Sequence, residues 1–366
     1  MSNPERRLAI LVGGRSTEHD TSLLSYRSVL HDLHARGRLP DVQVVAFACR
    51  DGTWRVHFPP VLPISPAKLD RGVKMTLGRV VDTLQRVDGF ILNLLHGNEG
   101  EDGAWQGLAE MADLRGSFGG LRGACLSMDK WTQSLLASAV CHAIRVPQTF
   151  RLTATTTDEE LAGILQAMQG GPVVVKPNSM GASHFAERVH KPTIETIRKK
   201  AEAILPFDPL ILVQRYVRGR EITCGCVERG GAVAPLPLVE IVTSGGFLGH
   251  AQKHRVGGMK AELVEDDPGL GARIQAVSRY LFGELGLSGM GSFDFIAGED
   301  GNLYFLEANA IPSLVPGGPF AVMLDAVGAD RAELVDWLVE AAAARKPRRK
   351  KLVYTIEPGG ERGKAA

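Results

Sequence analysis

A segment near the carboxyl end, GSFDFIAGEDGNLYFLEAN over residues 291–309, constrains the fold most, because it predicts two strands joined by a tight turn. Such a hairpin would set Asp294 on one strand opposite Glu307 and Asn309 on the other. Hard cations such as Mg²⁺ take carboxylate and amide oxygens, usually alongside substrate phosphates. The alternative is an ordinary hairpin whose acidic side chains face solvent. A metal site is therefore predicted only if other segments supply groups that hold a nucleotide.

The composition is that of a globular protein with a proper core and room for two or three domains. Of the 366 residues, 44% are hydrophobic and 23% are charged. Lys and Arg number 42 against 41 Asp and Glu, so neither nucleic acid nor a membrane surface is predicted as a partner. No run approaches the roughly 20 apolar residues of a membrane span, and Leu8–Val12 is too short for a signal peptide. Five cysteines without a Cys-x-x-Cys spacing predict buried thiols in a reducing cytoplasm.

Four regions follow one another along the chain. Residues 1–120 alternate predicted strands and helices, which favours an α/β unit around a mostly parallel sheet. Residues 121–213 and 214–345 are two further predicted units, and residues 346–366 form a basic tail predicted to be flexible. Strands are predicted over 8–12, 42–49, 89–95, 173–176 and 221–227, helices over 17–33, from a Ser127 cap through Leu136, and over 271–285, and a polar loop over 244–259.

Two lysines indicate an anion site. Lys176 ends a β-branched run, Lys130 lies in a Ser-Met-Asp-Lys segment, and lysine is rarely buried unless its ammonium has a partner. In the small-residue loop from Pro177 to Ser183, Gly181 would let the backbone approach an anion and Ser183 would donate a hydrogen bond. The alternative is a lysine that extends to solvent beside a surface loop.

Two acidic residues have candidate roles in binding ligands. The extended linker Gln214–Val217 can present backbone groups to an adenine edge, and Glu221 on the next strand can accept from ribose hydroxyls. An ion pair of Glu221 with Arg218 or Arg220 is the alternative. Glu18 follows a glycine pair at a predicted helix start, a position that suits an anion. Because the segment lacks a Gly-x-Gly-x-x-Gly fingerprint, Glu18 is instead a candidate for binding a substrate ammonium.

Six motifs occur in the order, and at roughly the spacing, of D-alanine–D-alanine ligases, which belong to the ATP-grasp superfamily. They are Gly13-Gly-x-Ser-x-Glu-His-x-x-Ser22, His96-Gly-x-x-Gly-Glu-Asp-Gly103, Met128-Asp-Lys130, Val175-Lys-Pro177, Arg220-Glu221 and Leu306-Glu-Ala-Asn309. The resemblance covers about residues 8–330 and implies a three-domain α/β ATP-grasp fold. A second Gly-Glu-Asp-Gly at Gly298–Gly301 is expected to be only the hairpin turn.

The resemblance also implies a role for individual residues, with ATP and two Mg²⁺ ions, or Mn²⁺ instead, between the central and C-terminal domains. The implied nucleotide set is Lys130 and Lys176 at the phosphates, Ser183 in the loop, Gln214, Arg215, Tyr216 and Val217 at adenine, and Glu221 at ribose. The implied metal ligands are Asp294, Glu307 and Asn309. Substrate contacts are implied for Glu18, Ser22, His96, Ser292 and Ser313, and catalytic roles for Glu18, Ser183, Lys253, His254 and Arg255.

The chain departs from the family around the second substrate. Ala182 replaces a serine of the phosphate loop, and His254 replaces the tyrosine of the family's Lys-Tyr pair, where it could act as a base or remain solvated. Ser292 stands where the family has an arginine that helps to stabilise the oxyanion, and Gly318 where a serine would hold a carboxylate. Because the implied metal ligands are all present, we predict a working ligase with an unusual acceptor, and Arg255 as the replacement positive charge.

The predicted activity is ATP-dependent ligation of an amino-acid-like carboxylate to an amine through an acyl phosphate, with release of ADP and phosphate. We favour a specialised amide or peptide synthetase. D-Alanine–D-alanine synthesis for the cell wall is the first alternative, and ligation of D-alanine to D-lactate is a narrower one. A non-catalytic ATP-binding sensor is the alternative from a different class. The resemblance also implies a homodimer.

Overall fold

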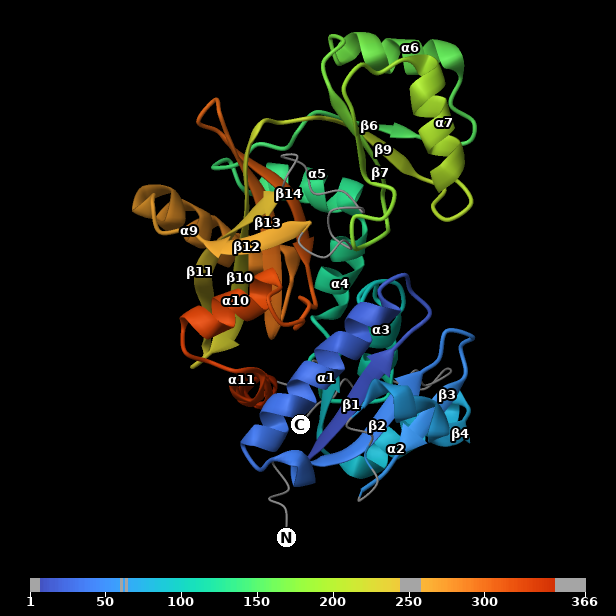
Figure 1. Ribbon diagram of the computed structural model, residues 1–366, viewed down its shortest axis with the longest axis vertical. Helices are drawn as coiled ribbons and strands as arrows, with labels where there is room; N and C mark the ends of the chain where they lie inside the picture. The colour runs from blue at the N-terminus through green and yellow to red at the C-terminus, as the bar shows by residue number, and fades with distance from the viewer. Residues whose placement is uncertain (1–6, 60–61, 63–64, 244–257, 346–366) are drawn as a thin grey trace, which may run out of the picture.

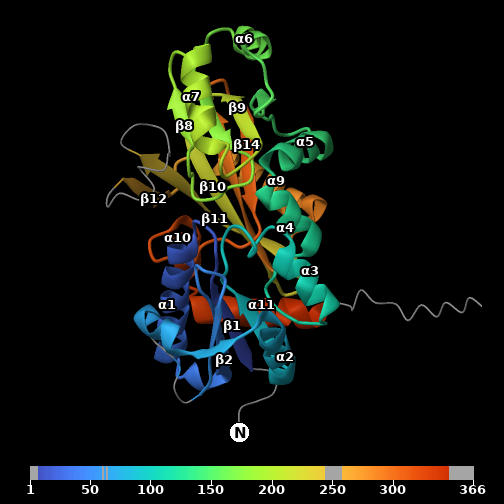
Figure 2. The same cartoon turned by 90° about the vertical axis from the view of Figure 1, so that its right-hand side faces the viewer.

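The computed structural model describes residues 7–345 apart from 60–61, 63–64 and 244–257. Three sheets stack along the long axis of the molecule, with the amino-terminal sheet at one end, the central sheet at the other and the carboxyl-terminal sheet between them (Figures 1 and 2). The predicted α/β class is confirmed. The predicted unit boundaries after residues 120, 213 and 345 stay a prediction.

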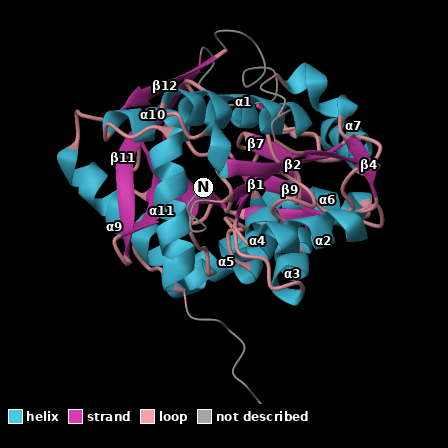
Figure 3. Cartoon of the chain, turned by 90° about the horizontal axis from the view of Figure 1, so that it is seen from below, coloured by secondary structure: helices cyan, strands magenta, loops and turns pink. Residues whose placement is uncertain are grey.

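The amino-terminal sheet has two parallel and two antiparallel strand pairings, so it is mixed rather than mostly parallel as predicted, and it has helices on both faces (Figure 3). It contains β1 (Leu8–Gly13), β2 (Val42–Ala48), β3 (Trp54–His57), β4 (Val73–Met75) and β5 (Phe90–Asn93), in the order β4-β3-β2-β1-β5, with α1 (His19–Ala35), α2 (Leu77–Val87), α3 (Ala104–Met111) and the 3₁₀ helices η2 (Leu39–Asp41) and η3 (Pro66–Arg71). Leu8, Ile10 and Val12 pack with α1, whereas Ala9 and Leu11 pack with α2. Both faces of β1 are therefore buried, which is why its sequence is apolar throughout.

The central sheet is antiparallel and is covered on one face only. It contains β6 (Thr149–Leu152), β7 (Val173–Pro177), β8 (Glu187–Val189) and β9 (Ile211–Arg215), in the order β6-β9-β7-β8, with α6 (Asp158–Ala167) and α7 (Ile194–Ile204). Val173 and Val175 join the core beneath these helices. Because side chains alternate along a strand, Val174 and Lys176 lie on the opposite face, which lines a pocket.

The carboxyl-terminal sheet contains the predicted metal hairpin. Its elements are β10 (Gly219–Arg229), β11 (Ala232–Thr243), β12 (Met259–Leu263), β13 (Met290–Gly298) and β14 (Leu303–Asn309), in the order β12-β11-β10-β13-β14, with α9 (Pro268–Leu285), α10 (Pro319–Ala326) and α11 (Arg331–Ala344). Asp294 pairs with Glu307 across β13 and β14, as predicted. The second Gly-Glu-Asp-Gly copy is the turn between these strands, where the Gly301 N–H donates to the Gly298 carbonyl at 2.9 Å.

The helix expected from Ser127 is two helices, α4 (Leu121–Met128) and α5 (Lys130–Val140), so the predicted cap is wrong. Asp129 caps α5, since its side chain accepts from the Thr132 N–H at 2.9 Å. The Ser127 hydroxyl instead donates to the Ala124 carbonyl at 2.9 Å, a back-bond within the last turn of α4. Both helices pack on β14, which places Lys130 at the edge of the carboxyl-terminal sheet.

The cysteines only partly follow the prediction of buried thiols. Cys141, Cys224 and Cys226 are buried and Cys49 is half-buried, whereas Cys125 on α4 is exposed. All five are free thiols. Across the described ranges, no helix combines the length and hydropathy that a membrane span requires.

Candidate active site

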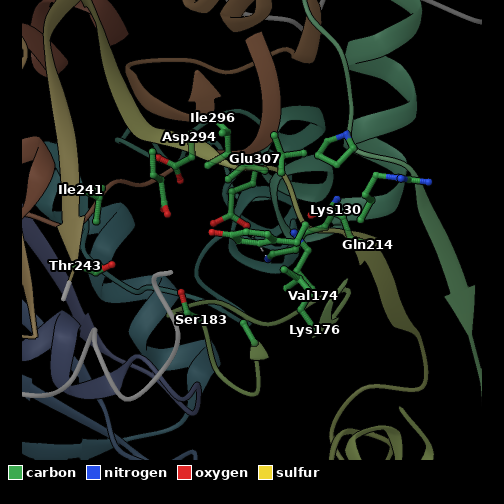
Figure 4. Close-up of a pocket in the computed structure, with 18 of the residues that line it drawn as sticks. Lys130, Val174, Lys176, Ser183, Gln214, Ile241, Thr243, Asp294, Ile296 and Glu307 are labelled. Atoms are coloured by element: carbon green, nitrogen blue, oxygen red, sulfur yellow. Dashed lines mark ion pairs between the residues drawn. The ribbon is translucent and has the colours of Figure 1, made fainter. Parts of the chain in front are cut away.

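A pocket lies between the uncovered face of the central sheet and the carboxyl-terminal sheet (Figure 4). Val174, Lys176 and Gln214 form one wall, and Ile296 and Glu307 belong to the other. Among the residues predicted to hold ATP or its metal ions, those that line the pocket are Lys130, Lys176, Ser183, Gln214, Arg215, Tyr216, Val217, Glu221, Asp294 and Glu307. The structure thus brings together segments that are up to about 180 residues apart in the sequence, because the two sheets face each other.

The two lysines lie in this pocket close to acidic groups. Lys130 Nζ is 3.2 Å from Glu307 Oε2 and donates to the Met180 carbonyl at 2.9 Å. Burial lowers the pKa of Lys176 to about 8, against the opposing effect of the Glu307 carboxylate. The charge of Lys130 lowers the pKa of Lys176 further. Two half-buried ammonium groups whose charges disfavour one another suit a multiply charged anion such as a polyphosphate.

The hairpin oxygens form a candidate magnesium site. Asp294 Oδ1 accepts from the Thr223 hydroxyl at 2.6 Å, and Asp294 Oδ2 accepts from Asn309 Nδ2 at 3.2 Å. This bond leaves the Asn309 amide oxygen as the atom available to a cation. Within the described part of the chain, no group of three or more His, Cys, Asp or Glu residues could hold a metal ion alone. The donor set fits Mg²⁺, which commonly takes one or two protein carboxylates and completes its shell with water and substrate phosphates.

Arg220, which precedes Glu221 on β10, forms ion pairs with two other carboxylates. Arg220 Nη2 is 2.7 Å from Glu240 Oε2 and 3.0 Å from Asp266 Oδ1. Glu221 itself lines the pocket. Its carboxylate can therefore accept hydrogen bonds from hydroxyl groups of a ligand in the pocket.

The loop after β7 is held at its base and strained at its tip. Asn178 Nδ2 donates to Asp129 Oδ1 at 3.0 Å, and the Ser179 N–H donates to Asp208 Oδ2 at 2.6 Å. Ala182, Ser183 and Phe185 have positive φ angles of 53°, 54° and 57°. The left-handed region is unfavourable for residues with a side chain, so packing must hold this tip in place.

Glu18 lies beside this loop rather than inside the nucleotide pocket. It occupies the N-cap position of α1. A Cβ added at Gly181 would stand 2.1 Å from Glu18 Oε2, and one added at Gly97 would stand 3.0 Å from it. The carboxylate therefore sits between two glycine-containing loops, at the junction of the amino-terminal and central units.

Two of the other predicted substrate residues, Ser22 and His96, hydrogen-bond to segments near Glu18. Ser22 is fully buried and its Oγ accepts from the Gly13 N–H at 2.8 Å. His96 Nδ1 is 3.1 Å from the Ile311 carbonyl oxygen. Ser292 is buried opposite Asn309, and Ser313 lies half-buried in the segment after β14. Lys253, His254 and Arg255 lie outside the described residues.

Glu101 is a site residue that the sequence reasoning did not single out. It is buried, and its two carboxylate oxygens accept from the Gly97 N–H at 2.8 Å and the Ile311 N–H at 3.1 Å. Burial, together with the charge of Glu18, raises the pKa of Glu101 to about 8. Its position in the His96–Gly103 motif was the available signal. Glu101 connects the Gly97 loop to the segment that follows the hairpin of β13 and β14.

The fold and this pocket, with two lysines opposite a hairpin of oxygen ligands between two antiparallel sheets, define an ATP-grasp protein. The family model described as the D-ala D-ala ligase N-terminus matches residues 7–117, and that of the D-ala D-ala ligase C-terminus matches residues 144–340. The chain is 31% identical to D-alanine–D-alanine ligase A of Mesorhizobium japonicum over 93% of this chain and 98% of that protein. The chain therefore belongs to the D-alanine–D-alanine ligase family, whose members are carbon–nitrogen bond-forming ligases.

Solved structures show the same fold. The D-alanine–D-alanine ligase of Coxiella burnetii superposes with a TM-score of 0.76 at 23% identity, over 92% of this chain and 94% of that one. The enzyme of Bacillus anthracis, solved in complex with ATP, superposes with a TM-score of 0.68 at 22% identity, over 92% and 97% of the two chains.

Proposed function

We propose that this chain joins the carboxyl group of one D-alanine to the amino group of a second D-alanine, with conversion of ATP to ADP and phosphate. This proposal takes the place of the specialised synthetase predicted from sequence. The family match covers both ends of the chain, and the Mesorhizobium relative carries this activity in its name. The observation that carries the proposal is that Lys130, Lys176, Asp294 and Glu307 line one pocket, with Glu18 at its edge.

The nucleotide has a place for each of its parts. Val174 on the central sheet and Ile296 and Leu306 on the opposite sheet supply apolar walls for the purine. Glu221, Lys130 and Lys176 line the same pocket. Glu221 would bind the ribose, and the ammonium groups of the two lysines would neutralise phosphate charge. Two positive charges placed at the phosphates before reaction stabilise the charge that develops during transfer.

Asp294, Glu307 and Asn309 would hold the magnesium ions, or manganese in their place, beside the phosphates. When bound, the metal neutralises charge on the transferred phosphoryl group. The Thr223 hydroxyl and the Asn309 amide both donate to Asp294, so the carboxylate keeps its orientation before a metal binds.

The reaction divides into two balanced steps. A carboxylate oxygen of the first D-alanine attacks the γ-phosphorus of ATP, the bond from this phosphorus to the β–γ bridging oxygen breaks, and ADP leaves. The amine of the second D-alanine attacks the acyl carbon, loses a proton, and expels inorganic phosphate. The first step brings a carboxylate and a phosphate, both negatively charged, together, so the positioning of the reactants and the cations of the pocket account for most of its acceleration.

Glu18 is the group that we assign to the ammonium of the first D-alanine. It faces Gly181 of the phosphate-side loop, so an amino acid bound to it lies close to the γ-phosphate. Glu101 lies behind this site, where burial favours its protonated form. With Glu101 neutral, Glu18 is the acidic group that presents a negative charge to the substrate.

The acceptor side is where the alternatives differ. Ser292 stands where the family resemblance implies an arginine that stabilises the oxyanion, and Gly318 where it implies a serine that holds the carboxylate of the second substrate. An acceptor without a carboxylate, or a hydroxy acid, is therefore the competing substrate. The ATP-binding sensor requires the same pocket and no turnover.

Measuring phosphate release from ATP distinguishes the D-alanine–D-alanine ligase from a ligase with another acceptor and from the ATP-binding sensor. The purified protein is given MgATP and D-alanine alone, and then D-alanine paired with L-alanine, D-serine, D-lactate or a simple amine, with products identified by mass. Dipeptide from D-alanine alone supports the proposal, and an Asp294→Asn variant should abolish it. Turnover that needs another acceptor would support the specialised synthetase instead. Binding of ATP without release of phosphate for any substrate pair would support the ATP-binding sensor.

A further inference from the structure

The side-chain amide of Gln214 is held in one orientation by a threonine behind it. Gln214 Nε2 donates to Thr149 Oγ1 at 2.9 Å, and Thr149 Oγ1 donates to the Pro147 carbonyl at 2.7 Å. A hydroxyl has a single hydrogen, and a carbonyl oxygen can only accept. With its hydrogen given to Pro147, the Thr149 oxygen can only accept from Gln214. The amide nitrogen must therefore face Thr149, because the amide oxygen has no hydrogen to donate.

This orientation leaves the amide oxygen as the end presented to the pocket. Gln214 lines the nucleotide pocket and is only 5% exposed. Within the described part of the chain, no group donates to Gln214 Oε1. Its register partner on β7 is Val174, part of the apolar wall that we assign to the purine (Figure 4). One fixed hydrogen-bond acceptor thus lies at the edge of the purine site.

A fixed acceptor distinguishes purines by their exocyclic group. Adenine carries an amino group that donates, whereas guanine and hypoxanthine carry a carbonyl oxygen at the same place. A carboxylate at position 214 would accept from either of its ends. The amide of Gln214 accepts at only one end, so its partner decides which end meets the base.

We propose that Thr149 is a positioning residue for nucleotide selection: it orients Gln214 so that the pocket prefers a purine with an amino group, rather than a carbonyl oxygen, at C6. The inference rests on the proposed function only in taking the pocket to hold a nucleoside triphosphate. Without the Thr149 hydroxyl, the Gln214 amide is free to rotate and to present its NH₂ group to a base carbonyl. Backbone groups of the Gln214–Val217 linker would still contact the base, so a residual preference for adenine remains.

The test compares ATP with ITP, which carries a carbonyl oxygen in place of the amino group. Thr149→Val keeps the side-chain shape and removes the hydroxyl, and Thr149→Ser retains the hydroxyl as the matched control. We expect Thr149→Val to lower the ATP-to-ITP ratio of kcat/KM about tenfold, because one hydrogen bond contributes about this factor to binding. The effect of Thr149→Val should appear in KM for the nucleotide, with kcat at saturation unchanged. Thr149→Ser should keep the ATP-to-ITP ratio of kcat/KM of the unaltered protein.

Direct binding separates this inference from the proposed function. The dissociation constants of MgATP and MgITP are measured by calorimetry without any amino acid. A preference for ATP that falls in Thr149→Val and returns in Thr149→Ser supports the inference even if no dipeptide forms. A ratio unchanged in a Thr149→Val protein with native circular dichroism would overturn it, as would equal behaviour of the two variants.

Discussion

The Glu18 carboxylate lies directly against the backbone of Gly181, since a Cβ at this glycine would stand 2.1 Å from Glu18 Oε2. Glu18 belongs to the amino-terminal unit, whereas Gly181 belongs to the loop after β7. The contact joins the site assigned to the first amino acid to the loop that borders the phosphates. Any side chain at position 181 must move one of the two.

Gly181→Ala should therefore damage the reaction more than the fold. Gly181 does not have a positive φ, so the alanine meets no backbone strain, only the Glu18 oxygen. A displacement of about 1 Å between reacting groups can cost roughly 10²-fold in rate, and we expect a loss of that order in kcat/KM for the first D-alanine. Gly163→Ala on α6 is the matched control, because its Cβ would meet nothing within 4 Å. Equal kinetics in the two variants would contradict the assignment of Glu18.

Thr223 should control metal affinity through Asp294. Its hydroxyl donates to Asp294 Oδ1 at 2.6 Å, and it stands opposite Asp294 in the register of β10 and β13. Loss of an outer partner of a metal ligand typically costs 10- to 100-fold in affinity or activity. We expect Thr223→Val to raise the Mg²⁺ concentration needed for half-maximal phosphate release by about tenfold. Thr223→Ser should behave as the unaltered protein, and a Val variant with unchanged Mg²⁺ dependence would count against the metal site.

Phe185 and Phe207 should stabilise the strained loop as a pair. Their rings stack with centroids 5.3 Å apart, and Phe185 has a φ of 57°. Aromatic pairs contribute about 0.5–1.5 kcal/mol beyond burial, whereas a left-handed non-glycine residue costs about 1–2 kcal/mol. Phe207→Ala should thus lower the free energy of unfolding, measured with urea, by about 1 kcal/mol. Phe207→Ala should have a smaller effect in a Phe185→Gly background, and strictly additive effects would show that the stack does not hold the loop.

Local patterns were enough to predict the hairpin of β13 and β14. Alternating apolar residues and a Glu-Asp-Gly turn fall within one segment, so Asp294 and Glu307 could be placed opposite each other without the rest of the fold. Lys176 was found in the same way, at the end of a β-branched strand. These are contacts that short-range spacing determines.

Contacts between distant segments could not be predicted. β11 contains Pro235, and a proline argues against a strand that is paired on both sides. β11 nevertheless pairs with β10 and with β12. The register of β10 and β11 is irregular between Cys224 and Cys226, opposite this proline. Glu101 bridges Gly97 and Ile311, and Thr149 orients Gln214 across β6 and β9. Such partners are brought together only by sheet order, which a single sequence does not specify.

Nucleotide binding should weaken as pH rises through the pKa of Lys176. Burial lowers this pKa to about 8, the carboxylates of Glu307, Glu221 and Asp294 raise it, and the Lys130 ammonium lowers it. The ammonium of Lys176 is present below pH 8 and is lost above it, so the free protein holds one positive charge fewer at alkaline pH. Because kcat/KM reports the free enzyme, its value for ATP should fall above a pKa of about 8. In Lys176→Arg the guanidinium stays charged, and the fall should move out of the range up to pH 10 or so. The measurement is a pH profile of kcat/KM for ATP at saturating Mg²⁺ and D-alanine in both proteins, and a descending limb that is the same in the arginine variant would assign the titration to another group.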